Sequence, residues 1–191
     1  YIQQAQNLVK GVPQTQNGYI YNPECPGLGP KTYPVGFPIM LSPVMAIFDM
    51  DMDALIDYMA VLFILFGLMV FVFSRTGAGS IVALIAAITL VYHPSLLEFK
   101  REVMSDVPFA LFTLLALHLA TWKKWVWAGI FMAIAASTRT VGVSLMLASS
   151  VLLAIQCVRH RNNILADAKI WLQFGGFCVA VAGYFFINHL L

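Results

Sequence analysis

The chain has 191 residues, of which 60% are hydrophobic and 10% charged, and its formal net charge is +2 at pH 7. Soluble domains have an apolar share of about 45–50%, so this composition excludes an ordinary soluble domain. We therefore expect an integral membrane protein, and we expect no nucleic-acid partner.

Residues 1–53 are predicted to form one region on the outer face of the membrane. Apolar residues recur at helical spacing in 1–10, which predicts a short amphipathic helix. Residues 11–35 are rich in Pro and Gly and predict a loop. Residues 36–48 are apolar but too short and too interrupted by proline to cross a bilayer, so we expect a helix that lies in the membrane interface.

Residues 54–191 are predicted to form a transmembrane helical bundle. A helix needs about 20 apolar residues to cross a bilayer, and its backbone groups must be satisfied within the segment. The predicted spans are 54–73, 78–92, 104–122, 125–138, 140–158 and 169–190. The fold class is therefore all-α integral membrane, with about six transmembrane helices and an outer-face loop that carries short interfacial helices. Gly77 and Gly79 lie beside apolar runs and predict close helix packing.

The distribution of Lys and Arg orients these helices, because basic residues accumulate on the cytoplasmic side of membrane proteins. Placing residues 1–53 outside leaves six of the eleven Lys and Arg residues inside and five outside. The inner residues are Arg75, Lys123, Lys124, Arg159, Arg161 and Lys169, and the outer ones are Lys10, Lys31, Lys100, Arg101 and Arg139. Eight of the nine acidic residues then also lie outside.

Asp49, Asp51 and Asp53 occupy alternate positions before the first predicted span. Carboxylate oxygens are hard ligands, so the three residues could build a site for a divalent metal ion. Alternatively, they form a solvated turn that caps the following helix. No other metal-ligand pattern and no nucleotide-binding motif occurs in the sequence, and we predict a protein without a cofactor.

Residues 93–106 hold six ionisable groups in fourteen residues, between two long apolar runs. Charged groups at a membrane boundary are costly unless they pair or bind a ligand. The six are His93, Glu98, Lys100, Arg101, Glu102 and Asp106. This concentration of charge predicts a functional site.

Four segments carry a family resemblance: Tyr1–Gly11 (YIQQAQNLVKG), Lys31–Pro38 (KTYPVGFP), His93–Pro108 (HPSLLEFKREVMSDVP) and Thr138–Gly142 (TRTVG). In this order, and on one membrane face, they resemble the N-terminal half of the GT-C superfamily of polytopic glycosyltransferases. The most similar group is the dolichyl-phosphate-mannose protein mannosyltransferase-like group, which includes the bacterial aminoarabinose transferases of lipid A.

The resemblance implies transfer of a sugar from a polyprenyl-phosphate donor to a lipid, glycan or protein acceptor on the outer face, with inversion. It also implies a bacterial inner membrane, with residues 1–53 facing the periplasm or exterior. In that family a carboxylate just before the position of Tyr1 is taken as the base. We therefore expect the chain to be an N-terminal fragment of a larger enzyme.

Such a reaction needs fixed positive charge on the leaving phosphate and a carboxylate near the acceptor hydroxyl. The predicted topology places four basic residues at the outer interface, where a donor phosphate would bind: Lys31, Lys100, Arg101 and Arg139. By resemblance, Asp106 matches a second acidic position of the family's active site. It would orient the acceptor or the base.

Each of these residues also has a structural interpretation. Lys100 and Arg101 could pair with neighbouring Glu residues or reach lipid headgroups. Arg139 could anchor a helix end at the interface. Asp106 could be only the first residue of a helix, with Ser105 as its cap.

Two other functions remain open from the sequence. One is a catalytically inactive accessory subunit with the same fold, which would contribute helices to a larger membrane complex. The other is a transporter of a lipid-linked or anionic solute. Transporters place charge near the bilayer midplane, whereas this chain concentrates its charge at one interface, which favours the transferase.

Overall fold

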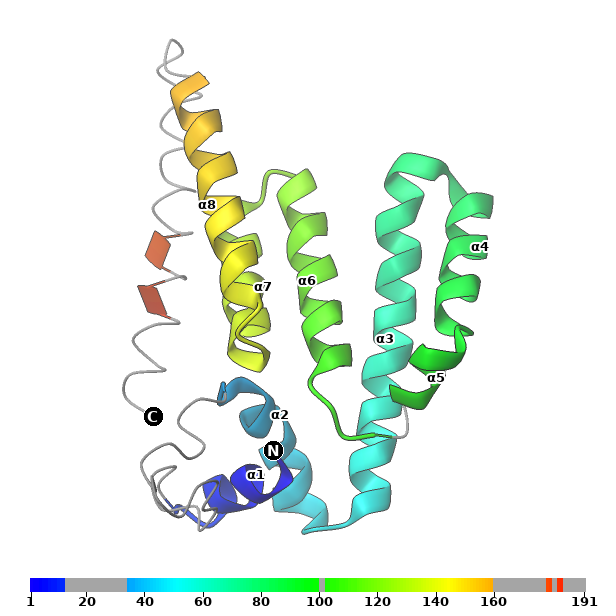
Figure 1. The fold of residues 1–191 in the computed structure, drawn as a ribbon, viewed down its shortest axis with the longest axis vertical. Helices are drawn as coiled ribbons and strands as arrows, with labels where there is room; N and C mark the ends of the chain where they lie inside the picture. Colours follow the sequence, from blue (N-terminus) through cyan, green and yellow to red (C-terminus); the bar gives the residue numbers. More distant parts are fainter. Residues whose placement is uncertain (13–33, 100–101, 160–177, 180–181, 184–191) are drawn as a thin grey trace.

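The computed structural model describes residues 1–12, 34–99, 102–159, 178–179 and 182–183 (Figure 1). Every regular element among these residues is an α-helix, which confirms the predicted all-α class for this part of the chain. The helices are α1 (Ile2–Val9), α2 (Gly36–Phe48), α3 (Met52–Ala78), α4 (Ser80–Val91), α5 (Pro94–Phe99), α6 (Asp106–Thr121), α7 (Trp125–Thr138) and α8 (Gly142–Arg159).

Five of the six predicted spans coincide with one helix each, namely α3, α4, α6, α7 and α8. The sixth, 169–190, lies outside the described residues except at 178–179 and 182–183. Within the described chain, α3 alone is both long and apolar enough to cross a membrane, with 27 residues. At 1.5 Å per residue it is about 40 Å long. The helices α4, α6 and α7 have 12, 16 and 14 residues and are correspondingly shorter.

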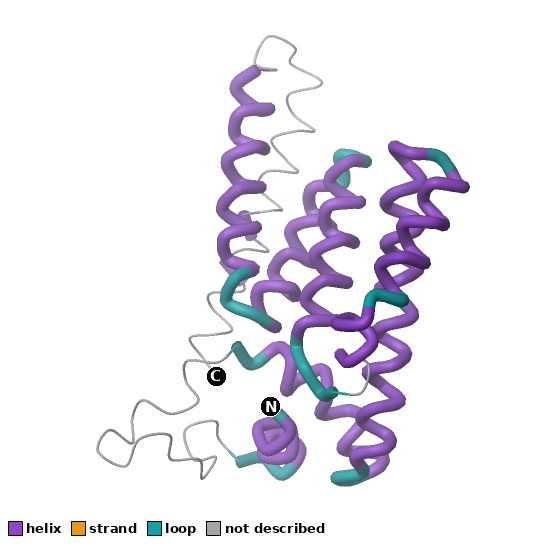
Figure 2. The backbone as a smooth tube through the Cα atoms, turned by 45° about the vertical axis from the view of Figure 1, so that its right-hand side comes forward, coloured by secondary structure: helices purple, strands orange, loops and turns teal. Residues whose placement is uncertain are grey.

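The long helices form two antiparallel hairpins that lie side by side (Figures 1 and 2). One hairpin is α3 with α4 and the other is α6 with α7, and α3 packs against α6 between them. The predicted short helices α1 and α2 pack together at one end of this layer, and α2 contacts both α3 and α7 there. The helices α1 and α2 therefore adjoin the end of the bundle at which α6 begins and α7 ends.

Two clusters of buried apolar side chains hold these elements together. The first joins α2, α3 and α6, and includes Phe37, Leu41, Met59 and Leu111. The second joins α6, α7 and α8. Because the first cluster crosses from α2 into the bundle, α2 is fixed relative to the helices that follow it.

Close packing of helices occurs at glycines other than those predicted. A Cβ on Gly67 would lie 2.8 Å from Cγ2 of Val91, so the last turn of α4 meets the middle of α3. The prediction for Gly77 and Gly79 is wrong, because a Cβ at either position would meet no described atom within 4 Å. Gly79 instead has a φ of +79°, which allows the sharp turn between α3 and α4.

The three aspartates lie at or just before the N-terminus of α3, and one of them caps the helix. Oδ1 of Asp51 accepts hydrogen bonds from the backbone N–H groups of Asp53 at 2.9 Å and Ala54 at 3.4 Å. The capping interpretation is therefore confirmed for Asp51. In the described part of the chain, no group of three His, Cys, Asp or Glu side chains is placed to hold a metal ion.

Candidate functional site

The α6–α7 hairpin brings two of the sequence-predicted site residues together. Asp106 is the first residue of α6, and Arg139 follows the last residue of α7. The two helices have similar lengths and are joined by a tight turn at 122–124, so the start of α6 lies beside the end of α7. Residues 33 positions apart in the sequence therefore become neighbours.

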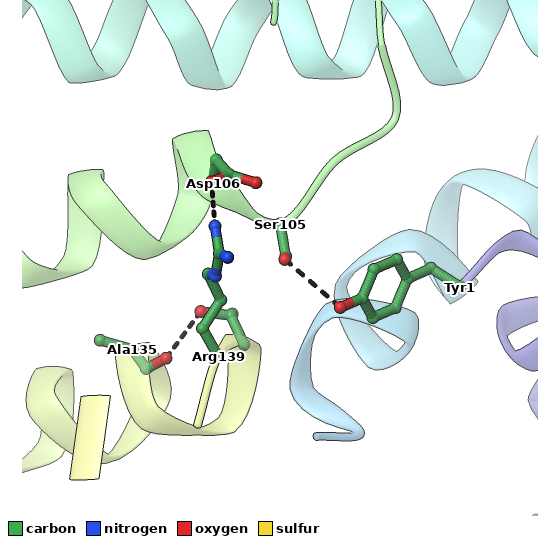
Figure 3. Close-up of polar contacts among 6 residues, drawn as sticks. Tyr1, Ser105, Asp106, Ala135 and Arg139 are labelled. Atoms are coloured by element: carbon green, nitrogen blue, oxygen red, sulfur yellow. Dashed lines mark hydrogen bonds and ion pairs between the residues drawn. The ribbon is translucent and has the colours of Figure 1, made fainter. Parts of the chain in front are cut away.

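Asp106 and Arg139 form an ion pair, in which Nη1 of Arg139 donates to Oδ1 of Asp106 (Figure 3). The Arg139 side chain is 39% exposed and that of Asp106 37% exposed, so a solvent or ligand molecule can still reach both groups. Asp106 lies in the first turn of α6, where the positive end of the helix dipole favours a carboxylate. Arg139 is therefore not an isolated cation, because its guanidinium donates to Asp106.

Backbone hydrogen bonds fix the turn that carries Arg139. The Arg139 N–H donates to the carbonyl of Ala135 at 3.1 Å, and the Arg139 carbonyl accepts from the Gly142 N–H at 2.9 Å. Arg139 itself leaves the helix in an extended conformation. The side chain therefore starts from a fixed point at the end of α7.

Two glycines, one before α7 in the sequence and one after it, contact the same end of α7. A Cβ on Gly142 would lie 2.5 Å from Cα of Ala136, and one on Gly36 would lie 2.6 Å from the carbonyl carbon of Ser137. Both positions therefore require the absence of a side chain. The start of α2 and the start of α8 approach the α7 backbone directly, within three residues of Arg139.

Ser105 links Asp106 to the N-terminal segment. Its hydroxyl donates to the hydroxyl oxygen of Tyr1 at 3.5 Å (Figure 3). The Tyr1 ring meets the Phe37 ring edge-on, with 5.0 Å between centroids. Ser105 is the N-cap residue of α6, as one of the interpretations of Asp106 expected, but its side chain makes no cap hydrogen bond. The hydroxyl instead bonds to Tyr1, the residue before α1.

A pocket with a volume of about 380 Å³ lies beside the ion pair. Its walls come from α3, α5, α6 and the turn after α7, and are formed by Phe66, Leu96, Phe99, Asp106, Val107, Phe109, Ala110, Arg139 and Val141. Asp106 and Arg139 are the two polar members of this lining, and the other seven are apolar. Among the described residues the pocket thus combines an apolar wall with one acid and one base.

Sequence reasoning missed the apolar wall of the pocket. The residues Leu96 and Phe99 lie in the charged stretch that drew attention for its ionisable groups. Their spacing of three positions places both on one face of a short helix, which is the signal that could have found them. Phe66 had no comparable signal, because it is one of many apolar residues in α3.

Three of the predicted phosphate-binding residues lie outside the described residues: Lys31, Lys100 and Arg101. Their role stays a prediction. The structure brings together the remaining two predicted site residues, Asp106 and Arg139, and it does so as a direct pair.

Charge is divided between the two ends of the bundle. The turn after α6 carries Lys123 and Lys124, and the last turn of α3 carries Arg75. These two helix ends lie together, as shown by the contact between the Phe73 and His118 rings, whose centroids are 6.4 Å apart. The acidic residues of the described chain precede or begin α3 and α6, or lie in and after α5: Asp49, Asp51, Asp53, Asp57, Glu98, Glu102 and Asp106.

Comparison of the chain with protein-family models, with curated proteins and with solved structures gives no match.

Proposed function

We propose that the chain is the N-terminal part of an integral membrane GT-C-type glycosyltransferase. It would transfer a sugar from a polyprenyl-phosphate donor to an acceptor on the outer face of a bacterial inner membrane. The observation that supports this best is the pocket itself, in which seven apolar side chains adjoin one carboxylate and one guanidinium. An amphiphilic phosphate has the same division into an apolar chain and a charged head.

In the proposed reaction, Arg139 binds the donor phosphate. A guanidinium presents a planar set of N–H donors that matches a phosphate, and its charge does not depend on pH. The acceptor hydroxyl oxygen attacks the anomeric carbon, and the bond from that carbon to the phosphate oxygen breaks. The phosphate leaves with the electron pair, and Arg139 stabilises the developing charge. The hydroxyl proton passes to a carboxylate base. Asp106 orients either that base or, through a hydrogen bond, the acceptor hydroxyl.

The membrane setting is supported by the exposed surface of the helices. Large apolar side chains are exposed along α3, α4 and α8, for example Ile64, Ile81, Ile85, Leu147 and Val151. Soluble proteins rarely expose apolar patches of this extent. We propose that these faces contact lipid and that the predicted spans form about six transmembrane helices.

The orientation is supported by the charges at the two ends. The turn with Lys123 and Lys124 lies beside Trp122 and Trp127, both more than half exposed. Tryptophan is enriched at both membrane interfaces, and Lys and Arg accumulate on the cytoplasmic side, so this turn fits a cytoplasmic boundary. Residues 1–53 would then face the periplasm, together with Asp106 and Arg139.

Substitution of the ion pair tests the proposed activity. We expect Asp106→Asn and Arg139→Ala, made in the intact protein, each to lower sugar transfer by roughly 10²-fold or more, since positioned acid–base and charge-stabilising groups contribute about that much. Transfer of radiolabelled sugar from a polyprenyl-phosphate donor is the measurement. The matched control is Asp57→Asn, which removes an exposed carboxylate of α3 that does not line the pocket. Unchanged transfer in both pocket variants would contradict the proposal.

The second candidate is an inactive accessory subunit, and one observation favours it. Asp106 and Arg139 satisfy each other, as the members of a purely structural ion pair do. For a subunit of this kind, Asp106→Asn would leave transfer by the complex intact and would only lower the stability of the bundle. Measuring the melting temperature beside the transfer rate separates the two functions.

A further inference from the structure

The ion pair with Asp106 engages the guanidinium group that the proposed phosphate ligand would bind. The guanidinium of Arg139 is the one cation in the pocket lining of the described chain, and it donates to Asp106. A phosphate that enters the pocket must therefore share or displace the Asp106 carboxylate. It also approaches a like charge, which opposes its binding.

Both partners are accessible enough for such an exchange. Each side chain is more than a third exposed, and exposed ion pairs contribute little to stability because water screens them. The backbone that carries Arg139 is fixed by its bonds to Ala135 and Gly142. Exchange of partners thus requires a rotation of side chains, without movement of α7.

We propose that Asp106 and an amphiphilic phosphate compete for Arg139, so that binding of the phosphate releases the Asp106 carboxylate. This inference rests on the proposed function and deepens it. In the empty site Asp106 is held by Arg139. In the occupied site Arg139 binds the phosphate, and Asp106 is free to accept a hydrogen bond from a second substrate. Binding of the donor then favours binding of the acceptor, and a bound acceptor favours the donor by the same factor.

The apolar wall determines which phosphates compete well. Phe66, Phe99 and Val107 offer contacts to a hydrocarbon chain beside the charged pair. A free phosphate ion makes none of these contacts, and an uncharged alcohol makes no bond that requires Arg139. A prenyl monophosphate makes both.

The test measures equilibrium binding of geranyl phosphate, a ten-carbon prenyl monophosphate, to the intact protein in phosphatidylcholine nanodiscs. We expect Asp106→Asn to bind it about tenfold more tightly than the wild-type protein, which corresponds to about 1.4 kcal/mol. Arg139→Gln is expected to bind it at least tenfold more weakly. Misfolding does not explain a gain in affinity, so the sign of the Asp106→Asn effect separates competition from a structural role.

Three controls refine the measurement. Asp57→Asn removes the same charge outside the pocket and should bind geranyl phosphate like the wild-type protein. Geraniol, which lacks the phosphate, should bind wild-type and Asp106→Asn proteins equally. Inorganic phosphate should bind more weakly than geranyl phosphate, and equal binding of the two would assign the site to free phosphate and overturn the amphiphilic ligand.

Wild-type binding together with equal or weaker binding by Asp106→Asn would overturn the competition and leave the proposed function standing. If the wild-type protein binds no geranyl phosphate, the proposed function fails, and the inference that rests on it fails too.

Discussion

The Asp106–Arg139 pair shows how a few backbone contacts set the geometry of charged side chains. Arg139 is the residue at which α7 ends. Its N–H still bonds to the carbonyl of Ala135, but its own backbone is extended. Asp106 begins α6, where the helix dipole favours its charge. The pair therefore forms from two helix ends, and neither residue needs a long loop to reach its partner.

The Asp51 side chain caps α3, the longest helix of the described residues. Replacement by Ala removes the acceptor for the Asp53 and Ala54 N–H groups, and loss of such a cap costs about 1 kcal/mol. We expect Asp51→Ala to lower the free energy of unfolding by that amount, measured by denaturation in mixed micelles. The matched control is Asp51→Asn, which keeps a capping oxygen and should preserve most of the stability.

Asp49, two positions earlier, is expected to respond in the opposite direction. Its φ of 56° and ψ of −145° lie in a region that favours glycine, and a side chain there costs about 1–3 kcal/mol. We expect Asp49→Gly to raise the free energy of unfolding by about 1 kcal/mol, after the greater entropy of unfolded glycine is subtracted. Asp49→Ala keeps the Cβ atom, so a similar gain in that variant would contradict the strain as its cause.

At the scale of elements, the packing of α2 and α8 onto α7 positions the candidate site. Gly36 and Gly142 allow both helices to touch the α7 backbone close to Arg139. Neither contact can be relieved by rotation of a side chain, because the closest atoms include main-chain atoms of Ser137 and Ala136. The position of Arg139 thus depends on glycines that do not line the pocket.

Gly142→Ala tests this dependence. Overpacking of this kind costs about 1–3 kcal/mol, and we expect a lower melting temperature together with weaker binding of geranyl phosphate, because the turn that carries Arg139 is displaced. Gly77→Ala is the matched control, since a Cβ there meets nothing within 4 Å in the described structure. That variant should be as stable as the wild-type protein or slightly more stable, because Ala favours a helix more than Gly does. Normal binding by Gly142→Ala would contradict the role of this contact.

At the scale of the whole molecule, the two hairpins separate the charges. The helices α3 and α6 run in the same direction, so the acidic residues that precede them lie toward one end and the basic turn after α6 lies at the other. The candidate pocket lies toward the acidic end, where α1 and α2 also lie. Under the proposed function, the lipid-linked donor and its acceptor meet at this end.

The proposed orientation predicts which positions a membrane-impermeant maleimide can reach. In a variant with the native cysteines Cys25, Cys157 and Cys178 replaced by Ser, Asp53→Cys should be labelled in intact spheroplasts. Thr121→Cys should be labelled only after permeabilisation. Both positions are exposed in the structure, so failure to react reports the side of the membrane. The reverse labelling pattern would contradict the orientation.

Much of the local structure could be predicted from the sequence. Apolar runs and their interruption by Gly, Pro and charge predicted the positions of α2, α3, α4, α6, α7 and α8, because helix formation depends largely on neighbouring residues. The amphipathic spacing in residues 1–10 likewise predicted α1. The capping role of Asp51 was one of two open interpretations, since the same three aspartates also fit a metal site by composition.

The sequence by itself determined that the described chain is helical, where its helices other than α5 lie, and that Asp106 and Arg139 belong to the same end of the bundle. Only the tertiary structure decided that these two form a pair, that Phe66 of α3 and Leu96 and Phe99 of α5 complete a pocket beside them, and that Ser105 bonds to Tyr1. The physical reason is the distance in sequence between the residues that interact. Helix formation and capping are governed by residues within about four positions, whereas the pocket depends on how separate hairpins pack, and single contacts such as those of Gly36 and Gly142 set that packing.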